Sequence, residues 1–139
     1  MNKLHNGSKI SQIFCAAVLL AAVGGGGCGS TVPAGMLRVR GEVQHAGAAL
    51  PDGTILFEAV NGKASAAGRI LSNGRFESVM LPGDYRVAVR SYDGIFMIGD
   101  DGKQIRPKSR IPERMGSIAT SGITVTITPE GDPLVINLE

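Results

Sequence analysis

Apolar and polar residues alternate with a period of two along most of the chain after residue 36. The clearest case is residues 37–43, Leu-Arg-Val-Arg-Gly-Glu-Val, in which every second residue is apolar or glycine and the residues between them are charged. Such alternation predicts a β-strand with one buried and one solvated face, because successive side chains of a strand point to opposite sides. The same pattern recurs in six further segments, residues 54–60, 66–71, 75–80, 85–90, 123–128 and 134–138.

Short turn sequences separate most of these segments. Asn73-Gly74 predicts a type I′ hairpin turn, whose two central residues both need positive φ. Residues 50–53 (Leu-Pro-Asp-Gly) and 130–133 (Glu-Gly-Asp-Pro) are further turn signals. Seven short strands without helical periodicity predict an all-β domain over residues 37–139, a seven-stranded antiparallel sandwich. The expected core consists of Leu37, Val39, Val43, Ile55, Phe57, Phe76, Tyr85, Val87, Val89, Ile123, Val125, Ile127 and Ile136.

One long segment, residues 93–121, interrupts this regular spacing. It is too long for a hairpin, and loops of such length in compact domains are commonly functional or disordered. Between residues 103 and 114 it carries five cations against one acid. A solvated excursion is the simpler interpretation, and a site for anionic lipid, an acidic polymer or an envelope protein is the alternative. The candidate residues for such a site are Lys103, Arg106, Lys108, Arg110 and Arg114.

The first 27 residues have the layout of a secretory signal peptide. Residues 1–12 contain Lys3 and Lys9 and no acid, residues 13–23 are all apolar, and four glycines follow. The apolar run is shorter than the roughly 20 residues that a membrane-spanning helix needs. Residues 28–36, which are small and without periodicity, are then expected to form a flexible tether before the β-domain.

Cys28 directly follows the glycines, and this arrangement resembles that of a bacterial lipoprotein precursor, whose leader is removed and whose cysteine is acylated. The resemblance implies a protein of the cell envelope that is attached to the membrane by a lipid on Cys28. Gly26 and Gly27 fit the small residues that precede the cysteine in such signals, whereas Gly25 stands where an aliphatic residue is usual. Ordinary secretion after cleavage near residues 24–27 and an uncleaved anchor therefore stay open as alternatives.

Removal of the leader makes the protein electrically neutral. Of the 14 Lys and Arg residues, Lys3 and Lys9 lie in the leader, which leaves 12 cations against 12 Asp and Glu residues. A neutral chain has no basic field for nucleic acid, so we expect no nucleic-acid partner. After the leader the only histidine is His45 and the only cysteine is Cys28, which gives zinc too few nitrogen and sulfur ligands. We therefore expect neither a metal nor a cofactor.

Two stretches of the sequence resemble carboxypeptidase-regulatory-like, or transthyretin-like, β-sandwich domains. The first is Val39-Arg40-Gly41-Glu42-Val43 with residues 50–57, Leu-Pro-Asp-Gly-Thr-Ile-Leu-Phe. The second is Gly74-Arg75-Phe76 with residues 81–89, in which a Pro-Gly-Asp-Tyr turn leads into a strand. The resemblance implies a transthyretin-like sandwich without catalytic residues, since this module is an accessory in the carboxypeptidases. Residues 108–114 and 120–125 are also similar to the C-terminal part of small lipoproteins from planctomycete bacteria.

These observations together predict a non-enzymatic, lipid-anchored module of the cell envelope with a structural or binding role. The alternative in the same compartment is a carrier for a small or polymeric ligand, with its specificity in the loops at the strand ends. A small hydrolase is the third alternative, and it needs a pocket that holds His45 against a serine and an acid. The sequence contains no nucleophile elbow, which disfavours that third alternative.

Overall fold

The computed structural model describes residues 31–131 and 133–139, so the leader, Cys28 and the first part of the tether lie outside the described residues. Within these ranges the chain forms ten β-strands, one 3-10 helix and no α-helix. All seven segments with a two-residue period are strands, which confirms the all-β prediction. The elements are β1 (Leu37–His45), β2 (Ala48–Ala49), β3 (Gly53–Ala59), β4 (Ser65–Ile70), β5 (Arg75–Met80), β6 (Gly83–Arg90), β7 (Met97–Ile98), β8 (Gln104–Ile105), η1 (Glu113–Gly116), β9 (Ile123–Ile127) and β10 (Leu134–Leu138).

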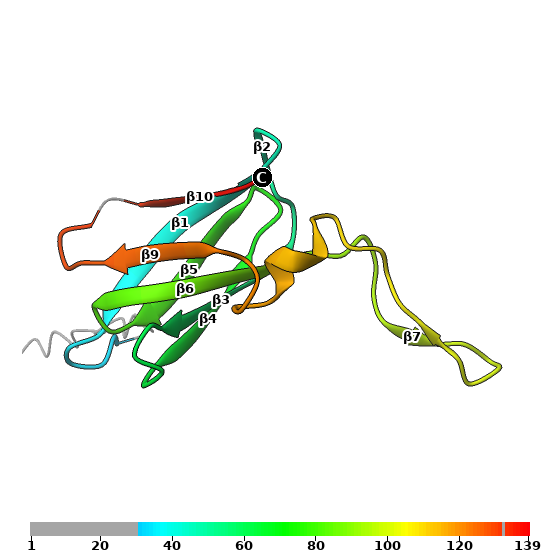
Figure 1. Cartoon of the computed structure of the whole chain (residues 1–139), viewed down its shortest axis with the longest axis horizontal. Helices are drawn as coiled ribbons and strands as arrows, with labels where there is room; N and C mark the ends of the chain where they lie inside the picture. The colour runs from blue at the N-terminus through cyan, green and yellow to red at the C-terminus, as the bar shows by residue number, and fades with distance from the viewer. Residues whose placement is uncertain (1–30, 132) are drawn as a thin grey trace, which may run out of the picture. The chain divides into compact units, whose positions relative to one another are not determined.

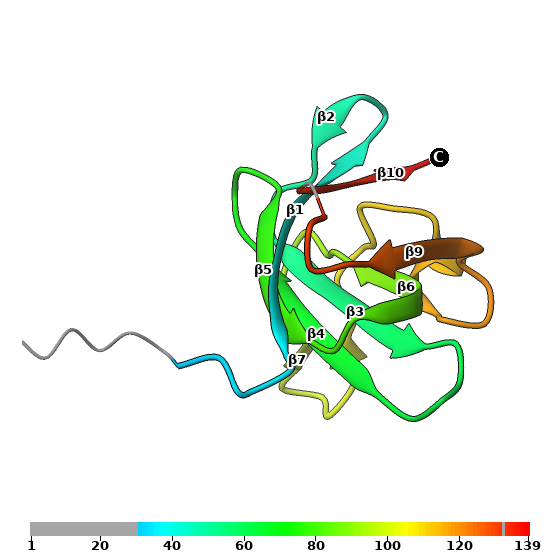
Figure 2. The ribbon, with the colours of Figure 1, turned by 90° about the vertical axis from the view of Figure 1, so that its left-hand side faces the viewer.

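Most of the strands belong to one sheet. Its strand order is β10, β1, β5, β4, β3, β6 and β9, with β2 paired to the end of β1. Neighbouring strands are antiparallel except β1 and β10, which run parallel with Gly41 opposite Leu134. The sheet curls into a half-barrel, so that its edge strands β9 and β10 face each other across an open seam (Figures 1 and 2). β7 and β8 form a separate two-stranded ribbon.

A seven-stranded sandwich of two facing sheets is not confirmed by this arrangement. The two-residue period shows which side of each strand is buried, and it does not show which strand lies beside it. One sheet that curls around its own interior buries one face of every strand, as two stacked sheets do. The parallel pairing of β1 with β10 likewise leaves no mark in the alternation of either strand.

The turn between β4 and β5 differs from the predicted type I′ turn. Gly74 has φ 79°, whereas Asn73 is not among the non-glycine residues with positive φ. The amide of Gly74 donates to the carbonyl of Leu71 (2.9 Å), and the amide of Leu71 donates to the carbonyl of Arg75 (2.8 Å). The hairpin loop is therefore longer than the two residues of a type I′ turn. Only Gly74 adopts a positive φ in it, which glycine does without steric cost.

The core lies inside the curl of the sheet and is centred on three aromatic rings. The ring of Phe57 lies 5.8 Å from that of Phe76 and 6.3 Å from that of Tyr85, measured between centroids. All but three of the predicted core residues are buried, and the exceptions, Leu37, Ile123 and Val125, pack half-buried against the core. Further buried apolar residues that were not predicted are Leu50, Ala59, Ile70, Met80, Ala88, Ile111, Met115 and Leu138.

Tyr85 links the turn before β6 to the core. Its side chain is 2% exposed, and its hydroxyl donates a hydrogen bond of 2.9 Å to the carbonyl of Leu81. A buried tyrosine needs a partner for its hydroxyl, and the Pro82-Gly83 turn brings the Leu81 carbonyl within reach. The turn and the aromatic core therefore stabilise each other.

Replacement of Tyr85 by Phe tests this link. We expect Tyr85→Phe to lower the free energy of unfolding by about 1 kcal/mol, because the hydrogen bond from the Tyr85 hydroxyl to the carbonyl of Leu81 is lost. Urea denaturation measures the change. Tyr92→Phe is the matched control, since the Tyr92 hydroxyl makes no hydrogen bond within the described part of the chain. Equal effects of the two substitutions would contradict the role given to Tyr85.

Replacement of Phe76 by Ala tests which face of β5 is buried. Phe76 is 3% exposed, so Phe76→Ala should lower the free energy of unfolding by about 3–5 kcal/mol, as is usual for a buried aromatic residue. Val60→Ala is the control at a side chain that is 56% exposed, and we expect it to cost under about 1 kcal/mol. A Phe76→Ala effect as small as that of the control would show that this ring is not in the core.

Candidate functional site

The long segment after β6 divides into two parts of different character. The main sheet of β1–β6, β9 and β10 is called the β-body, or body. Residues 93–108, which we call the arm, leave this sheet as a hairpin that projects from one end of the β-body (Figure 1). Within the arm β7 pairs with β8, Met97 lying opposite Ile105 and Ile98 opposite Gln104. Residues 109–121, which we call the packed segment, return to the body and include η1.

The base of the arm is held by hydrogen bonds on both of its strands. The amide of Asp93 donates to the carbonyl of Lys108 (3.0 Å), and the amide of Arg110 donates to the carbonyl of Ser91 (2.9 Å). Ser91 is buried, and its hydroxyl donates to the carbonyl of Asp52 (2.6 Å) in the turn before β3. The first bond joins the two ends of the arm to each other, and the other two connect the residues next to the arm with the turn before β3.

The packed segment contributes to the core. Ile111 is 5% exposed and Met115 is 3% exposed, and both belong to the cluster of buried apolar side chains. Ser121 is also buried, and its hydroxyl donates to the carbonyl of Val87 in β6. A solvated excursion therefore does not describe residues 109–121. Sequence reasoning missed these positions because Ile111 and Met115 are separated by Pro112 and two charged residues and do not alternate with a period of two, the pattern by which the core was predicted.

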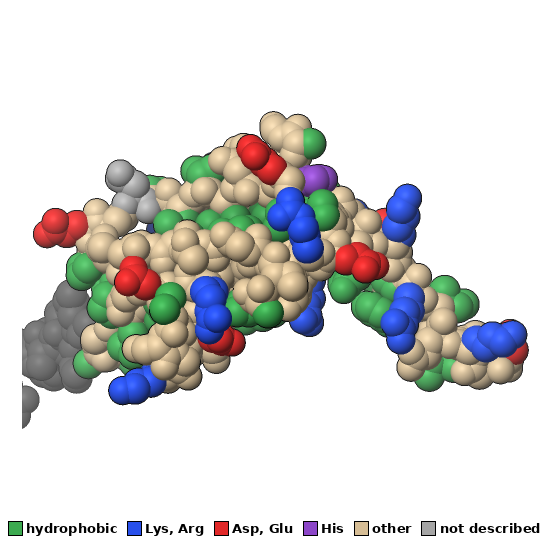
Figure 3. Space-filling view, viewed as in Figure 1, with side chains coloured by type: hydrophobic (Ala, Val, Ile, Leu, Met, Phe, Trp, Pro, Cys, Tyr) green, Lys and Arg blue, Asp and Glu red, His purple; other side chains and the backbone are tan. Residues whose placement is uncertain are grey.

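The five candidate cations do not form one patch. Lys103 lies near the tip of the arm, where its Nζ is 3.0 Å from Asp101, and Arg110 Nη1 donates to the carbonyl of Pro51 (3.3 Å). Arg114 donates to a main-chain oxygen of Glu139. Arg106 and Lys108 form no ion pair within the described residues. Figure 3 shows the basic side chains of the arm as separate groups.

Acidic residues balance the cations once the arm is considered as a unit. The hydrogen bond from Lys103 lowers the pKa of Asp101 below its ordinary value, so this carboxyl is charged at neutral pH. Three acids and three cations lie between residues 93 and 108, namely Asp93, Asp100, Asp101, Lys103, Arg106 and Lys108. The arm is therefore formally neutral, and the excess of positive charge seen in residues 103–114 comes from the choice of that window.

The most unusual feature of the arm is its apolar surface. Two of its side chains, Ile95 and Ile98, are 74% and 75% exposed, and hydrophobic side chains gather on the part of the arm nearest the body (Figure 3). The ring of Phe96 stacks edge-on against that of Tyr92, with centroids 5.3 Å apart, and is still 61% exposed. The exposed apolar residues of the arm are Ile95, Phe96, Met97, Ile98 and Ile105.

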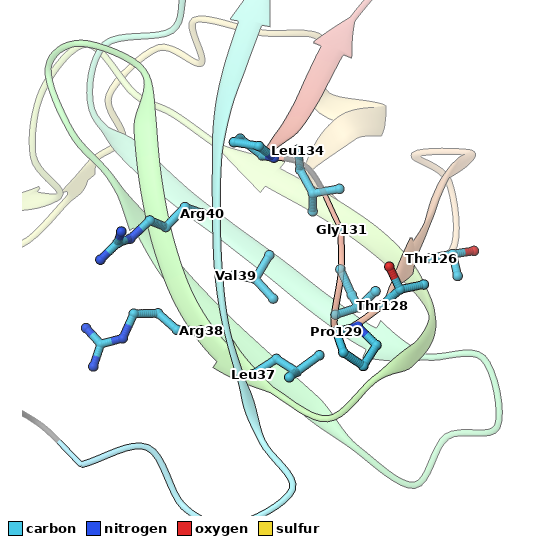
Figure 4. A pocket seen from close by; sticks show the side chains of 11 residues that line it. Leu37, Arg38, Val39, Arg40, Thr126, Thr128, Pro129, Gly131 and Leu134 are labelled. Atoms are coloured by element: carbon cyan, nitrogen blue, oxygen red, sulfur yellow. The ribbon is translucent and has the colours of Figure 1, made fainter.

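A hollow of ≈ 460 Å³ opens in the seam between the edge strands. Its wall is formed by the first half of β1, the end of β9 and the loop that leads into β10. Leu37 and Val39 point toward the side of Pro129, whereas Arg38 and Arg40 point away on the other side of β1 (Figure 4). The hollow exists because β10 pairs with β1 only from Gly41 onward, so the preceding residues of β1 have no neighbour on that side.

Glu77 forms ion pairs with two arginine side chains on the face of the sheet opposite the hollow. It accepts hydrogen bonds from Arg38 Nη1 (2.6 Å) and Arg40 Nε (2.9 Å) across the β1–β5 pair. The hydrogen bond from Arg40, together with the charges of both guanidinium groups, lowers the pKa of Glu77 below its ordinary value of 4.5. All three side chains are exposed to solvent to a large extent, so the cluster orders this face and adds little to stability.

His45 at the end of β1 has a structural contact. Its Nδ1 lies 3.1 Å from the carbonyl oxygen of Leu138, so this nitrogen is the donor, since a carbonyl can only accept. No group of three or more His, Cys, Asp or Glu side chains with the spacing of a metal site is present in residues 31–131 and 133–139. In the same ranges no helix is long and apolar enough to cross a membrane.

Comparisons with known proteins give no family. No protein-family model and no curated protein matches the sequence. Among solved structures, a 9R-lipoxygenase from Cyanothece PCC8801 is similar with a TM-score of 0.38 and 14% identity. The alignment covers 74% of this chain and 16% of the lipoxygenase, so the chain spans a small part of that protein's length. The similarity is too low to carry an argument about fold or activity.

The acid dependence of stability tests the Glu77 cluster. A carboxyl with a lowered pKa stabilises the folded protein above its ordinary pKa, and this contribution is lost as the pH falls through the lowered value. The melting temperature of the wild type should therefore exceed that of Glu77→Gln at neutral pH, and the difference should vanish as the pH falls below 4.5 and through the lowered pKa. Glu130→Gln, in an exposed loop, is the control and should show no such dependence. A Glu77→Gln difference that is constant with pH would contradict the pairing.

Proposed function

We propose that this protein is a non-enzymatic, lipid-anchored module of the cell envelope that presents the arm for binding. The lipid is carried by Cys28, the leader is residues 1–27, and the protein is anchored with its β-body in the periplasm or outside the cell. Its partners are the membrane, through the lipid, and an envelope protein or anionic polymer. No catalytic residue, metal or cofactor has a part in this proposal.

The observation that carries the proposal is the placement of the arm relative to the start of the β-body. Residues 31–36 lead into one end of the sheet, and the arm leaves the sheet at the other end (Figure 1). A body that is held at a membrane by its N-terminal tether therefore carries the arm at the end opposite its point of attachment (Figure 1). The side chains that are most unlike an ordinary solvated surface are then at the end of the sheet opposite residues 31–36 (Figure 1).

The fold belongs, in this proposal, to the transthyretin-like sandwiches. The turn of residues 81–85 supports it, because the buried Tyr85 hydroxyl ties this turn to the strand that follows, as the resemblance in sequence implies. The half-barrel is an open version of such a fold, in which the strands of one curled sheet take the place of two separate layers. This assignment places no catalytic residue in the body.

A carrier for a small or polymeric ligand is the second candidate function. The hollow of ≈ 460 Å³ in the seam favours it, since ligand sites commonly have volumes of about 300–1,000 Å³. The side chains of Leu37 and Val39 on one side and Pro129 on the other suit a ligand with an apolar part (Figure 4). The loop that borders the hollow follows the end of β9, and loops at strand ends are where the sequence analysis expects a carrier to have its ligand specificity.

Replacement of Cys28 tests the anchoring. The full-length wild type, expressed in a Gram-negative host, should remain with washed membranes and move into the detergent phase on Triton X-114 partitioning, because acyl chains bind bilayers strongly. Cys28→Ala should lose both properties. Intact mass measurement should place the N-terminus of the purified wild type at Cys28, with the added mass of the acyl chains.

Cys15→Ala is the matched control for this experiment. Cys15 lies in the apolar part of the leader, so its replacement should leave membrane attachment and the mature mass unchanged. A wild-type N-terminus at residues 24–27, or a mature protein without acyl chains, would reject the lipid anchor and favour ordinary secretion. Retention of the complete leader would favour the uncleaved anchor.

A further inference from the structure

We propose that the outer face of the sheet, on the side of β1, β5 and β4 that points away from the core, binds an acidic polysaccharide. This surface, which we call the arginine face, carries four exposed arginine side chains on three neighbouring strands, namely Arg38, Arg40, Arg69 and Arg75. The proposed function names an anionic polymer among the partners, and this inference places that polymer on the body instead of the arm. It rests on the proposed function only for the presence of such a polymer around the protein.

Strand pairing brings the four arginines together. Arg40 and Arg69 lie directly opposite Glu77, one on each side of it, because β5 runs between β1 and β4. Neighbouring strands are about 4.8 Å apart, so these two arginines are about 10 Å apart across the sheet. Arg38 precedes Arg40 by two residues and points to the same side of β1 (Figure 4), and Arg75 precedes Glu77 by two residues on β5. The four guanidinium groups are therefore close enough to contact one extended ligand.

The acids of this face do not neutralise its arginines. The outward positions of the three strands hold two glutamates against the four arginines, which leaves two positive charges. Glu77 already accepts hydrogen bonds from both arginines of β1, and Glu42 accepts one from the side-chain amide of Gln44 (3.0 Å). Arg69 and Arg75 form no ion pair within residues 31–131 and 133–139. Their guanidinium groups are therefore available to the anionic groups of a ligand.

A second hollow, of ≈ 540 Å³, borders the arginine face and suits the rings of a sugar chain. Arg40 and Arg75 belong to its lining, together with the exposed apolar side chains of Leu71 and Val135. A guanidinium group pairs with a carboxylate through two parallel hydrogen bonds, which a lysine cannot form. A polyuronate offers both complementary features, since each of its sugar rings has C–H groups on its faces and carries one carboxylate.

The composition of the face disfavours a nucleic acid and a bilayer. Proteins that bind single-stranded nucleic acid stack the bases on exposed aromatic side chains. β1, β4 and β5 expose no such ring, since the only aromatic residue among them, Phe76, is buried in the core. A helix or loop that lies in a bilayer surface buries projecting apolar side chains in it, whereas Leu71 and Val135 line a hollow. The charge and shape of the face therefore favour an acidic polysaccharide.

Calorimetric titration with polygalacturonate tests the inference. The full-length wild type in mild detergent should bind this polymer at low salt, and added salt should weaken the binding because it screens exposed charges. Dextran, an uncharged polysaccharide, should not bind. The double substitution Arg69→Gln, Arg75→Gln should weaken the Kd by at least about tenfold, because it removes the two arginines that have no ion pair. Its thermal unfolding midpoint should equal that of the wild type, since both side chains are exposed.

The double substitution Arg106→Gln, Lys108→Gln is the matched control. It removes the same charge from the arm, where neither side chain has an ion pair within the described residues, and should leave the Kd within about twofold. A gain of affinity is expected from Glu77→Gln, which removes the carboxylate that competes with the polymer for the arginines of β1. The Kd should tighten by at least about threefold, a change that loss of folding cannot produce. Glu130→Gln, in an exposed loop, should leave it unchanged.

Four results would overturn the inference. They are no binding of polygalacturonate at low salt, a double arginine variant that binds as the wild type does, an equal loss of binding in the arm variant, and binding of oligothymidylate or phosphatidylglycerol vesicles as tight as that of the polyuronate. The vesicle measurement uses the Cys28→Ala chain without detergent, so that no acyl chain contributes to it. Loss of binding in the arm variant alone would keep the proposed function and reject the arginine face. An unacylated wild type that binds polygalacturonate through the arginine face would reject the lipid anchor alone.

Discussion

The close approach of three strands at Gly41 is the contact on which the half-barrel depends. β1 is the only strand of the main path that pairs with β5 on one side and with the parallel strand β10 on the other. A Cβ atom at Gly41 would lie 2.7 Å from the ring of Phe76 and would also collide with the carbonyl oxygen of Leu134. Glycine therefore lets the aromatic core and the C-terminal strand meet β1 at one point. With β10 in this position, the buried residues Ile136 and Leu138 close one side of the curl.

The same contact determines where the fold stays open. β10 begins opposite Gly41 and continues toward the end of β1, so the residues of β1 before Gly41 have a neighbour only on the side of β5. The opposite edge strand, β9, pairs with β6 and leaves its other side free. The seam and its hollow are thus direct consequences of the register of β10. They need no insertion or strained backbone to explain them.

The sequence predicted the local structure of the body far better than its arrangement. Alternation placed all seven main strands and most of the core, since burial of one face requires a period of two. The number of sheets and the parallel β1–β10 pair could not be predicted, because these depend on contacts between distant segments that leave the alternation unchanged. The buried residues Ile111 and Met115 were missed for a related reason, since they lie outside the two-residue alternation that identified the rest of the core.

The arm shows how the choice of a sequence window changes an electrostatic argument. Residues 103–114 look basic in isolation, but in the folded chain Arg110 and Arg114 contact the body. The arm itself contains three acids, Asp93, Asp100 and Asp101, which balance the charge of its three cations. What distinguishes the arm in three dimensions is the run of exposed apolar residues from Ile95 to Ile98, which follows one turn after β6 and has the composition of a buried strand. The signal was present in the sequence, yet hydrophobicity alone cannot separate a buried strand from an exposed one.

Stability and the proposed binding surface of the arm therefore belong to different parts of the chain. The curled sheet contains the aromatic rings, the tyrosine tie and the packed segment, whereas the arm is joined to it by a few hydrogen bonds at its base. An element with few buried contacts opens at little cost in free energy, and it tolerates change without loss of the fold. Binding surfaces are commonly placed on such elements, supported by a rigid scaffold. In the proposed function the body thus supplies the rigid support at which the arm begins, and the exposed apolar side chains of the arm are the surface available for binding.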